Sequence, residues 1–116
     1  MKQTINTENT QSQMSKGVLE LCTLSVLAIG EAYPTEIIEQ LKSSKMMIVE
    51  GTLYPLLTRL KNANYLTYRW EESTSGPPRK YYKLTDQGVK LLSELENTWD
   101  EMAHAVNKLL KENKRK

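Results

Sequence analysis

Residues 75–85 have the sequence SGPPRKYYKLT and combine signals for a turn, a strand and a helix start. The glycine and the two prolines favour a turn or an extended tip. Two cations, Arg79 and Lys80, follow directly, and the adjacent tyrosines after them favour a strand. Thr85 then offers a hydroxyl N-cap, and Asp86 places a negative charge at the positive end of a helix. We therefore predict a positively charged hairpin tip that leads into a helix.

The segment before this tip supplies the other strand of the hairpin. The sequences LTYRWEE (66–72) and RKYYKLT (79–85) are short and rich in aromatic residues and threonine. They are separated by STSGPP (73–78), whose glycine and prolines suit a turn and not a strand interior. Tyr81 and Tyr82 point to opposite faces of their strand, and we assign Tyr82 to the face that packs on the core.

Upstream of the hairpin, the apolar spacing changes from about 2 residues to about 3.6. In EGTLYPLLTRLKNANYL (50–66), a leucine stripe of Leu53, Leu56, Leu57 and Leu60 repeats at i, i+3, i+4 and i+7, as on the buried side of a helix. We expect this helix to start near Gly51 or Thr52. Pro55 should lie in its first turn, because a proline further in would remove a backbone hydrogen bond and clash with the preceding turn.

Two more helices are predicted towards the N-terminus. Apolar residues fall at helical intervals from about Lys16 to Ile29, and the pattern stops at Gly30. Pro34 suits the first position of the next helix, where its missing N–H costs nothing, and this helix should end near KSSK (42–45).

The last predicted helix runs from Asp86 to about Asn113 and carries a long apolar seam. Successive members of the seam are three or four residues apart, as in a coiled coil. Three preceding helices cannot cover a seam of this length, so it should pack against another helix and form a homodimer. The predicted dimer interface comprises Leu92, Leu95, Trp99, Met102, Val106 and Leu109.

The order of these elements is that of a winged helix-turn-helix with a C-terminal dimerisation helix, a mainly α fold with a small β-hairpin. With 116 residues, the chain has room for one such domain. We divide it into a flexible N-terminal segment (1–15), a DNA-binding domain (16–85), the dimerisation helix (86–113) and a tail (114–116).

The charge distribution favours DNA as a partner, although the net charge is only +2. Lys and Arg number 4 against 6 Asp and Glu in residues 1–50, 6 against 2 in residues 51–85, and 6 against 6 in residues 86–116. The middle segment has a surplus of 6 − 2 = 4 positive charges. It contains the helix that starts near Gly51 or Thr52, which is the predicted recognition helix, and the hairpin of residues 66–85, which is the predicted wing. Helices of this kind enter the major groove while cations contact phosphates.

Four cations of this segment are therefore predicted to contact DNA. Arg59 and Lys61 lie off the leucine stripe and are assigned to phosphates, with ordinary solvated side chains as the alternative. Arg79 and Lys80 at the stiffened hairpin tip are assigned to phosphates or the minor groove, with a role in solubility as the alternative.

The sequence offers little for catalysis, metal binding or membrane insertion. The single histidine, His104, is not accompanied by a metal-ligand or triad pattern, and no glycine-rich phosphate loop is present. We therefore expect no enzymatic activity, no cofactor and no metal. The lone Cys22 cannot form an intrachain disulfide, and no apolar run could span a bilayer, so we expect a cytoplasmic protein.

The sequences EGTLYPLLTRLKNANYL and SGPPRKYYKLTDQG resemble two motifs of the PadR family of bacterial transcriptional regulators, in the same order and at the same separation. The resemblance covers about residues 17–99. It implies a homodimer of the short PadR subfamily, in which the single C-terminal helix forms the interface, acting as a repressor on a two-fold symmetric operator. It also implies that Thr52, Tyr54 and Pro55 belong to the DNA surface, whereas from the sequence alone these residues could simply build a helix start.

Two further roles remain open at this stage. Some proteins of the PadR family bind planar drugs at a tryptophan of this helix, so Trp99 is also a candidate for binding a small planar hydrophobic effector, with interface packing as its alternative. The whole chain could instead be a protein-interaction adaptor whose wing docks on an acidic partner. A steep salt dependence of binding to duplex DNA would distinguish a DNA-binding regulator from such an adaptor.

Overall fold

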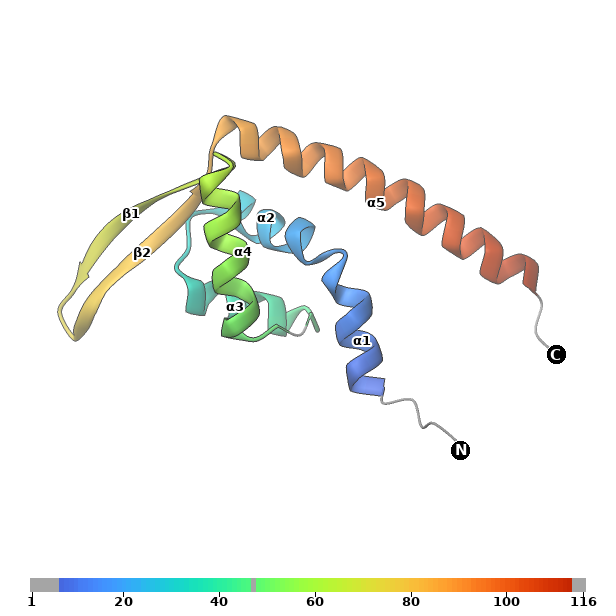
Figure 1. Ribbon diagram of the computed structural model, residues 1–116, viewed down its shortest axis with the longest axis horizontal. Coiled ribbons are helices and arrows are strands. Elements are labelled where there is room, and N and C mark those ends of the chain that lie inside the picture. The colour runs from blue at the N-terminus through green and yellow to red at the C-terminus, as the bar shows by residue number, and fades with distance from the viewer. Residues whose placement is uncertain (1–6, 47, 114–116) are drawn as a thin grey trace.

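The computed structural model describes residues 7–46 and 48–113 and has the predicted winged-helix architecture (Figure 1). Three helices, α2 (Leu19–Ile29), α3 (Pro34–Ser43) and α4 (Glu50–Asn62), form the body of the domain. The hairpin of β1 (Leu66–Ser73) and β2 (Gly76–Leu84) projects from one side of this body. The long helix α5 (Asp86–Asn113) extends well beyond its other side.

An additional helix, α1 (Thr7–Lys16), precedes the domain where we predicted a flexible segment. Its sequence, TENTQSQMSK, contains only one apolar residue, Met14, so no hydrophobic period marks it. It joins α2 through a turn at Gly17 and Val18, which moves the start of α2 from the predicted Lys16 to Leu19. Residues 1–6, and the predicted tail at 114–116, lie outside the described residues.

The core is built where the leucine stripe of α4 and the strand face assigned to Tyr82 predicted it. On α2 the predicted stripe was wrong, because the helix buries Leu19, Leu24 and Leu27 while Ile29, the last residue of that stripe, is 82% exposed. All four leucines of the α4 stripe are buried, and they pack with residues from α2, α3 and the hairpin, including Tyr82. Burial also raises the pKa of the Tyr82 phenol. The buried apolar residues are Leu19, Leu24, Leu27, Ala32, Ile37, Leu41, Ile48, Leu53, Leu56, Leu57, Leu60, Leu66 and Tyr82.

The end of α2 and the starts of α3 and α5 follow the predicted stop and start signals. Helix α2 ends at Ile29 before Gly30, and α3 begins with Pro34. The Glu36 carboxylate accepts a hydrogen bond of 3.2 Å from the Tyr33 N–H and so caps α3. At the start of α5, the Gly88 N–H donates to the Thr85 hydroxyl at 3.0 Å, as expected of an N-cap residue.

Our placement of Pro55 in the first turn of its helix was wrong. Helix α4 begins at Glu50, which puts Pro55 at the sixth position, in the second turn. A proline there deprives the Gly51 carbonyl of its helical partner and crowds it. Gly51 is exposed, and a Cβ on it would meet nothing within 4 Å. The helix tolerates Pro55 because the freed carbonyl lies at an open end that water can reach.

The hairpin is longer than predicted, and its prolines lie inside a strand. The pairs Ser73↔Gly76 and Glu71↔Arg79 leave Glu72 opposite both Pro77 and Pro78, which forms a β-bulge. A two-stranded sheet has two edges, so prolines at a bulge do not interrupt pairing with a third strand. A bridge between Ala32 and Tyr82, with N···O distances of 3.1 and 2.9 Å, ties the base of the hairpin to the α2–α3 loop.

Helix α5 leaves much of its apolar seam uncovered. Leu92 and Leu95 pack against the domain core, together with Leu91. Beyond them the seam is exposed, with 44% of Trp99, 55% of Met102 and 52% of Val106 accessible, and Leu109 is exposed as well. Across residues 7–46 and 48–113, none of the helices combines the length and apolarity that crossing a membrane requires.

Candidate nucleic-acid interface

The face of α4 opposite its leucine stripe is open to solvent. Helix α4 lies at the front of the body in Figure 1. A shallow surface on it is lined by Tyr54, Pro55, Thr58, Arg59, Asn62 and Ala63. Thr58 and Asn62 were not among the predicted contacts. Their signal was available in the sequence, because Pro55, Thr58 and Asn62 repeat at helical spacing on the side away from the leucines.

The predicted contacts on α4 divide between two flanks of this face. Tyr54 lies beside the hairpin and shares a depression with it, and the Lys61 ammonium lies 5.7 Å from the Tyr68 ring centroid. Arg59 lies on the other flank, towards α2, where its guanidinium is 3.6 Å from the Glu20 carboxylate. The Arg59 side chain remains 63% exposed, and a surface ion pair of this kind contributes at most about 1 kcal/mol. A phosphate could therefore replace Glu20 as its partner.

The two cations of the wing rest on aromatic rings. The Arg79 guanidinium carbon lies 4.4 Å from the centroid of the Tyr33 ring. The Lys80 ammonium lies 4.5 Å from the Tyr68 ring and 5.2 Å from the Trp70 ring. Within the described part of the chain, neither cation has a carboxylate within 4.0 Å. Both side chains are thus held in place while their charge stays free for an anionic ligand.

Arg69, the third cation of the outer hairpin, is already engaged. Its guanidinium pairs with the Glu31 carboxylate in the α2–α3 loop and, at 2.9 Å, with Glu71. The hydrogen bond from Arg69 lowers the pKa of Glu31, and the two carboxylates raise the pKa of Arg69. The guanidinium also lies 4.9 Å from the centroid of the Tyr81 ring. Arg69 therefore fixes the hairpin to the body and carries no free charge for a ligand.

A depression of about 340 Å³ lies between the wing, the start of α3 and the exposed face of α4. It brings together three predicted contacts, Tyr54, Arg79 and Lys80, and adds aromatic and hydroxyl groups that the sequence did not single out. Its lining comprises Tyr33, Pro34, Thr35, Tyr54, Thr58, Trp70, Pro78, Arg79, Lys80 and Tyr82. Cationic and aromatic groups in one concave surface suit a sugar-phosphate backbone.

Trp99 belongs to a different surface, formed by α1, α2 and α5. Beside it lies a mainly apolar hollow of about 210 Å³. The hollow is lined by Met14, Gly17, Val18, Glu20, Leu21, Leu95, Thr98, Trp99 and Met102. Because α1 was not predicted, its contribution to this surface was also missed. His104 lies further along α5, exposed, and the described residues contain no group of three His, Cys, Asp or Glu side chains that could hold a metal ion.

The family model of the PadR-like transcriptional regulators matches residues 23–94, which include α3, α4 and the hairpin. The chain belongs to this family. Solved PadR-like structures agree with the assignment. The chain is 54% identical to a PadR-like transcription factor from Bacteroides fragilis, with a TM-score of 0.72 over 87% of this chain and 98% of that one.

Two further PadR structures are similar over nearly their whole length. A PadR family regulator from Eggerthella lenta is 34% identical and has a TM-score of 0.81 over 90% of this chain and 91% of that one. A PadR-like regulator from Bacillus cereus is 37% identical and has a TM-score of 0.74 over 84% of this chain and 96% of that one. The PadR resemblance and the predicted winged-helix class are thereby confirmed, and the chain is a transcriptional regulator by family.

Proposed function

We propose that this PadR-like regulator represses transcription by binding a two-fold symmetric DNA operator as a homodimer. The observation that carries the proposal is the pair of wing cations, Arg79 and Lys80. They are fixed by aromatic rings, have no carboxylate partner in the described part of the chain, and lie next to the exposed face of α4. A surface that combines a solvent-facing helix with unpaired cations on a hairpin is suited to duplex DNA.

Helix α4 is proposed to lie in the major groove. Its 13 residues span about 20 Å, and the groove, about 12 Å wide, admits one helix. Thr52, Tyr54 and Pro55 near its start would approach base edges and the adjacent backbone. Asn62 joins them on the exposed face and could form the two hydrogen bonds that an asparagine side chain makes with adenine.

The cations around this helix would contact phosphates. Arg79 and Lys80 reach the backbone next to the depression under the wing, while Arg59 and Lys61 flank α4 on its two sides. Each contact of this type releases counterions and makes binding dependent on salt.

Dimerisation is proposed to occur through α5. The exposed part of the seam, from Trp99 to Leu109, is apolar at helical spacing and lacks cover from the described residues of its own chain. Leu92 and Leu95 have a second role, because they also pack on the core of their own domain. Two copies of α5 would cover each other and hold two α4 helices at a fixed separation, which is what a two-fold symmetric operator requires. We propose no catalytic activity, and we place this regulator in the cytoplasm, where its DNA lies.

Selection of bound duplexes from a random DNA pool tests this function. We expect a two-fold symmetric consensus whose affinity falls steeply as salt increases. A pool without any enriched sequence, together with weak and sequence-independent retention on heparin, would instead support an adaptor that binds an acidic protein.

A further inference from the structure

The end of α4 and the start of α5 are joined by a compact polar junction, formed by Asn64, Tyr65, Thr85 and Gly88. The Thr85 hydroxyl donates to the Asn64 carbonyl at 2.7 Å and accepts from the Gly88 N–H at 3.0 Å. The Thr85 N–H donates to the Tyr65 carbonyl at 3.1 Å. One hydroxyl group thus bonds to the loop that ends the recognition helix and to the first turn of α5.

The backbone at this junction leaves no room for adjustment. Asn64 adopts a left-handed conformation, with φ of 68°. Gly88 is buried, and a Cβ added to it would lie 2.1 Å from the Tyr65 carbonyl oxygen. At the other four glycines of the chain, an added Cβ would meet nothing within 4 Å. The first turn of α5 therefore packs directly on the backbone that follows α4.

A small change of angle at this junction would be amplified along α5. Met102, in the exposed seam, lies 102 − 88 = 14 residues after Gly88, which is about 21 Å along the helix. A tilt of roughly 10° at Gly88 would displace the seam there by about 4 Å, close to the rise of about 3.4 Å per base pair. In the proposed dimer, such a tilt would therefore change the separation of the two recognition helices by about one base pair.

We propose that Thr85 and Gly88 are positioning residues that set the half-site spacing which the dimer accepts. This inference rests on the proposed function and deepens it. Neither residue needs to contact DNA, because both act through the orientation of α4 relative to α5. Leu91, Leu92 and Leu95 also pack α5 against the core. Apolar packing is non-directional, so these contacts should keep α5 attached in junction variants while allowing it to repack at a different angle.

The test measures the spacing preference of four variants. The DNA is the duplex that wild-type protein selects, together with duplexes whose half-sites are moved together or apart by one or two base pairs. Thr85→Val removes both hydroxyl hydrogen bonds, and Gly88→Ala introduces the clash with Tyr65. The controls are Thr85→Ser, which keeps the hydroxyl, and Gly30→Ala, at a glycine whose added Cβ meets nothing within 4 Å.

We expect wild type and both controls to lose about 10-fold or more in affinity per base pair of altered spacing, since each base pair rotates a half-site by roughly 35°. Thr85→Val and Gly88→Ala should either bind best at a different half-site spacing or lose less than about 3-fold in affinity per base pair of altered spacing. Circular dichroism and thermal melting identify folded protein. If Gly88→Ala does not fold, Thr85→Val decides the outcome alone.

Two failures can be told apart. A uniform loss of affinity at all spacings, or an unchanged spacing preference, in folded Thr85→Val would overturn the positioning role and leave the proposed function intact. A wild-type chain that selects no symmetric duplex would remove the proposed function and this inference with it.

Discussion

Substitutions in the wing should separate the effect of the charge proposed to contact DNA from the effect of the aromatic rings that hold it. On the proposed function, Arg79→Ala or Lys80→Ala removes one phosphate contact per protomer and two per dimer. Each lost contact lowers the slope of log K against log salt by about 0.9, so either substitution should flatten the slope by about 1.8 per dimer. The affinity loss should be greatest at low salt, where counterion release contributes most.

Removing the supporting rings should lower the affinity for DNA without changing its salt dependence. Tyr33→Leu deletes the ring that lies 4.4 Å from Arg79, and Trp70→Leu deletes one that lies 5.2 Å from Lys80. Exposed cation–π contacts contribute about 0.5–1 kcal/mol, so the loss of preorganisation should weaken binding by up to roughly 2- to 5-fold per half-site. The salt slope should not change, because no charge is removed.

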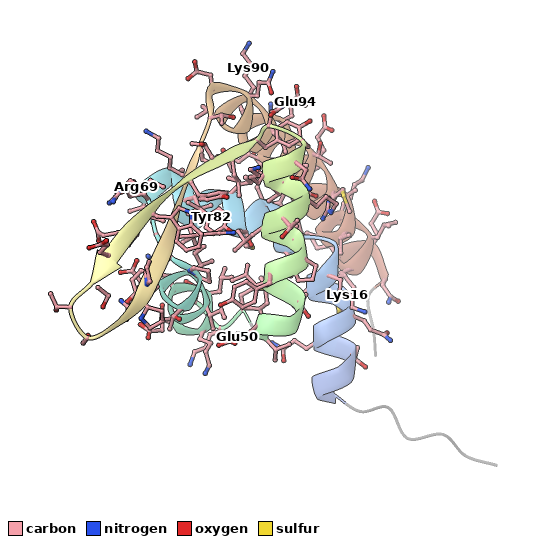
Figure 2. The ribbon with its side chains drawn as sticks, turned by 60° about the vertical axis from the view of Figure 1, so that its left-hand side comes forward. Lys16, Glu50, Arg69, Tyr82, Lys90 and Glu94 are labelled. Atoms are coloured by element: carbon pink, nitrogen blue, oxygen red, sulfur yellow. The ribbon has the colours of Figure 1, made fainter. Side chains whose placement is uncertain are left out.

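Fluorescence anisotropy with the selected duplex, over a series of salt concentrations, measures both quantities. Lys90→Ala is a matched control for charge. Lys90 is exposed on α5. Figure 2 shows it at the top of the molecule, pointing away from the body, whereas Glu50 lies near the bottom. Lys90→Ala should alter neither slope nor affinity. An unchanged slope in both Arg79→Ala and Lys80→Ala would refute the phosphate contacts, and a flattened slope in Tyr33→Leu would show that the rings do more than position charge.

Four other outcomes are expected. Tyr54→Ala should weaken binding to the selected duplex by about 1–3 kcal/mol and affect binding to unrelated duplexes less, which competition assays can show. Met102→Glu combined with Val106→Glu should yield monomers in sedimentation, and a persistent dimer would place the interface elsewhere. Thr23→Val should raise the free energy of unfolding by about 1 kcal/mol in urea, because it removes a buried hydroxyl that has no hydrogen-bond partner among the described residues and keeps the side-chain shape. A planar hydrophobic compound should quench Trp99 fluorescence and weaken operator binding.

The features that could be predicted from the sequence depend on local rules. The leucine stripe of α4 is a periodic pattern, and Thr85 caps α5 because a hydroxyl before a helix satisfies a free N–H wherever it occurs. These rules located α2 to α5 and both strands. Pro55 was misplaced because its cost depends on whether the Gly51 carbonyl is exposed, which only the tertiary structure shows.

The arrangement of the candidate interface could be predicted only in part. The segment 51–85 carries a surplus of positive charge, and this pointed to α4 and the hairpin as the proposed DNA surface. It could not show that Arg69 is paired with Glu31, 38 residues away, while Arg79 and Lys80 have no ion-pair partner among residues 7–46 and 48–113. Helix α1 was missed for another reason. A short polar helix has no periodic signal of its own, and it is stabilised by contacts with α2.

These arrangements constrain how an effector could act through Trp99. The hollow beside Trp99 lies between α1, α2 and the exposed seam of α5, so a ligand there would contact the proposed dimer interface and not the wing. Binding would alter operator affinity only if the ligand favoured one dimer geometry over another. Because the junction at Thr85 and Gly88 ties α5 to α4, a change in how the two α5 helices of the proposed dimer cross would move both copies of α4. In Trp70→Phe protein, where Trp99 is the only tryptophan, quenching with unchanged operator affinity would show a ligand that binds without favouring either geometry.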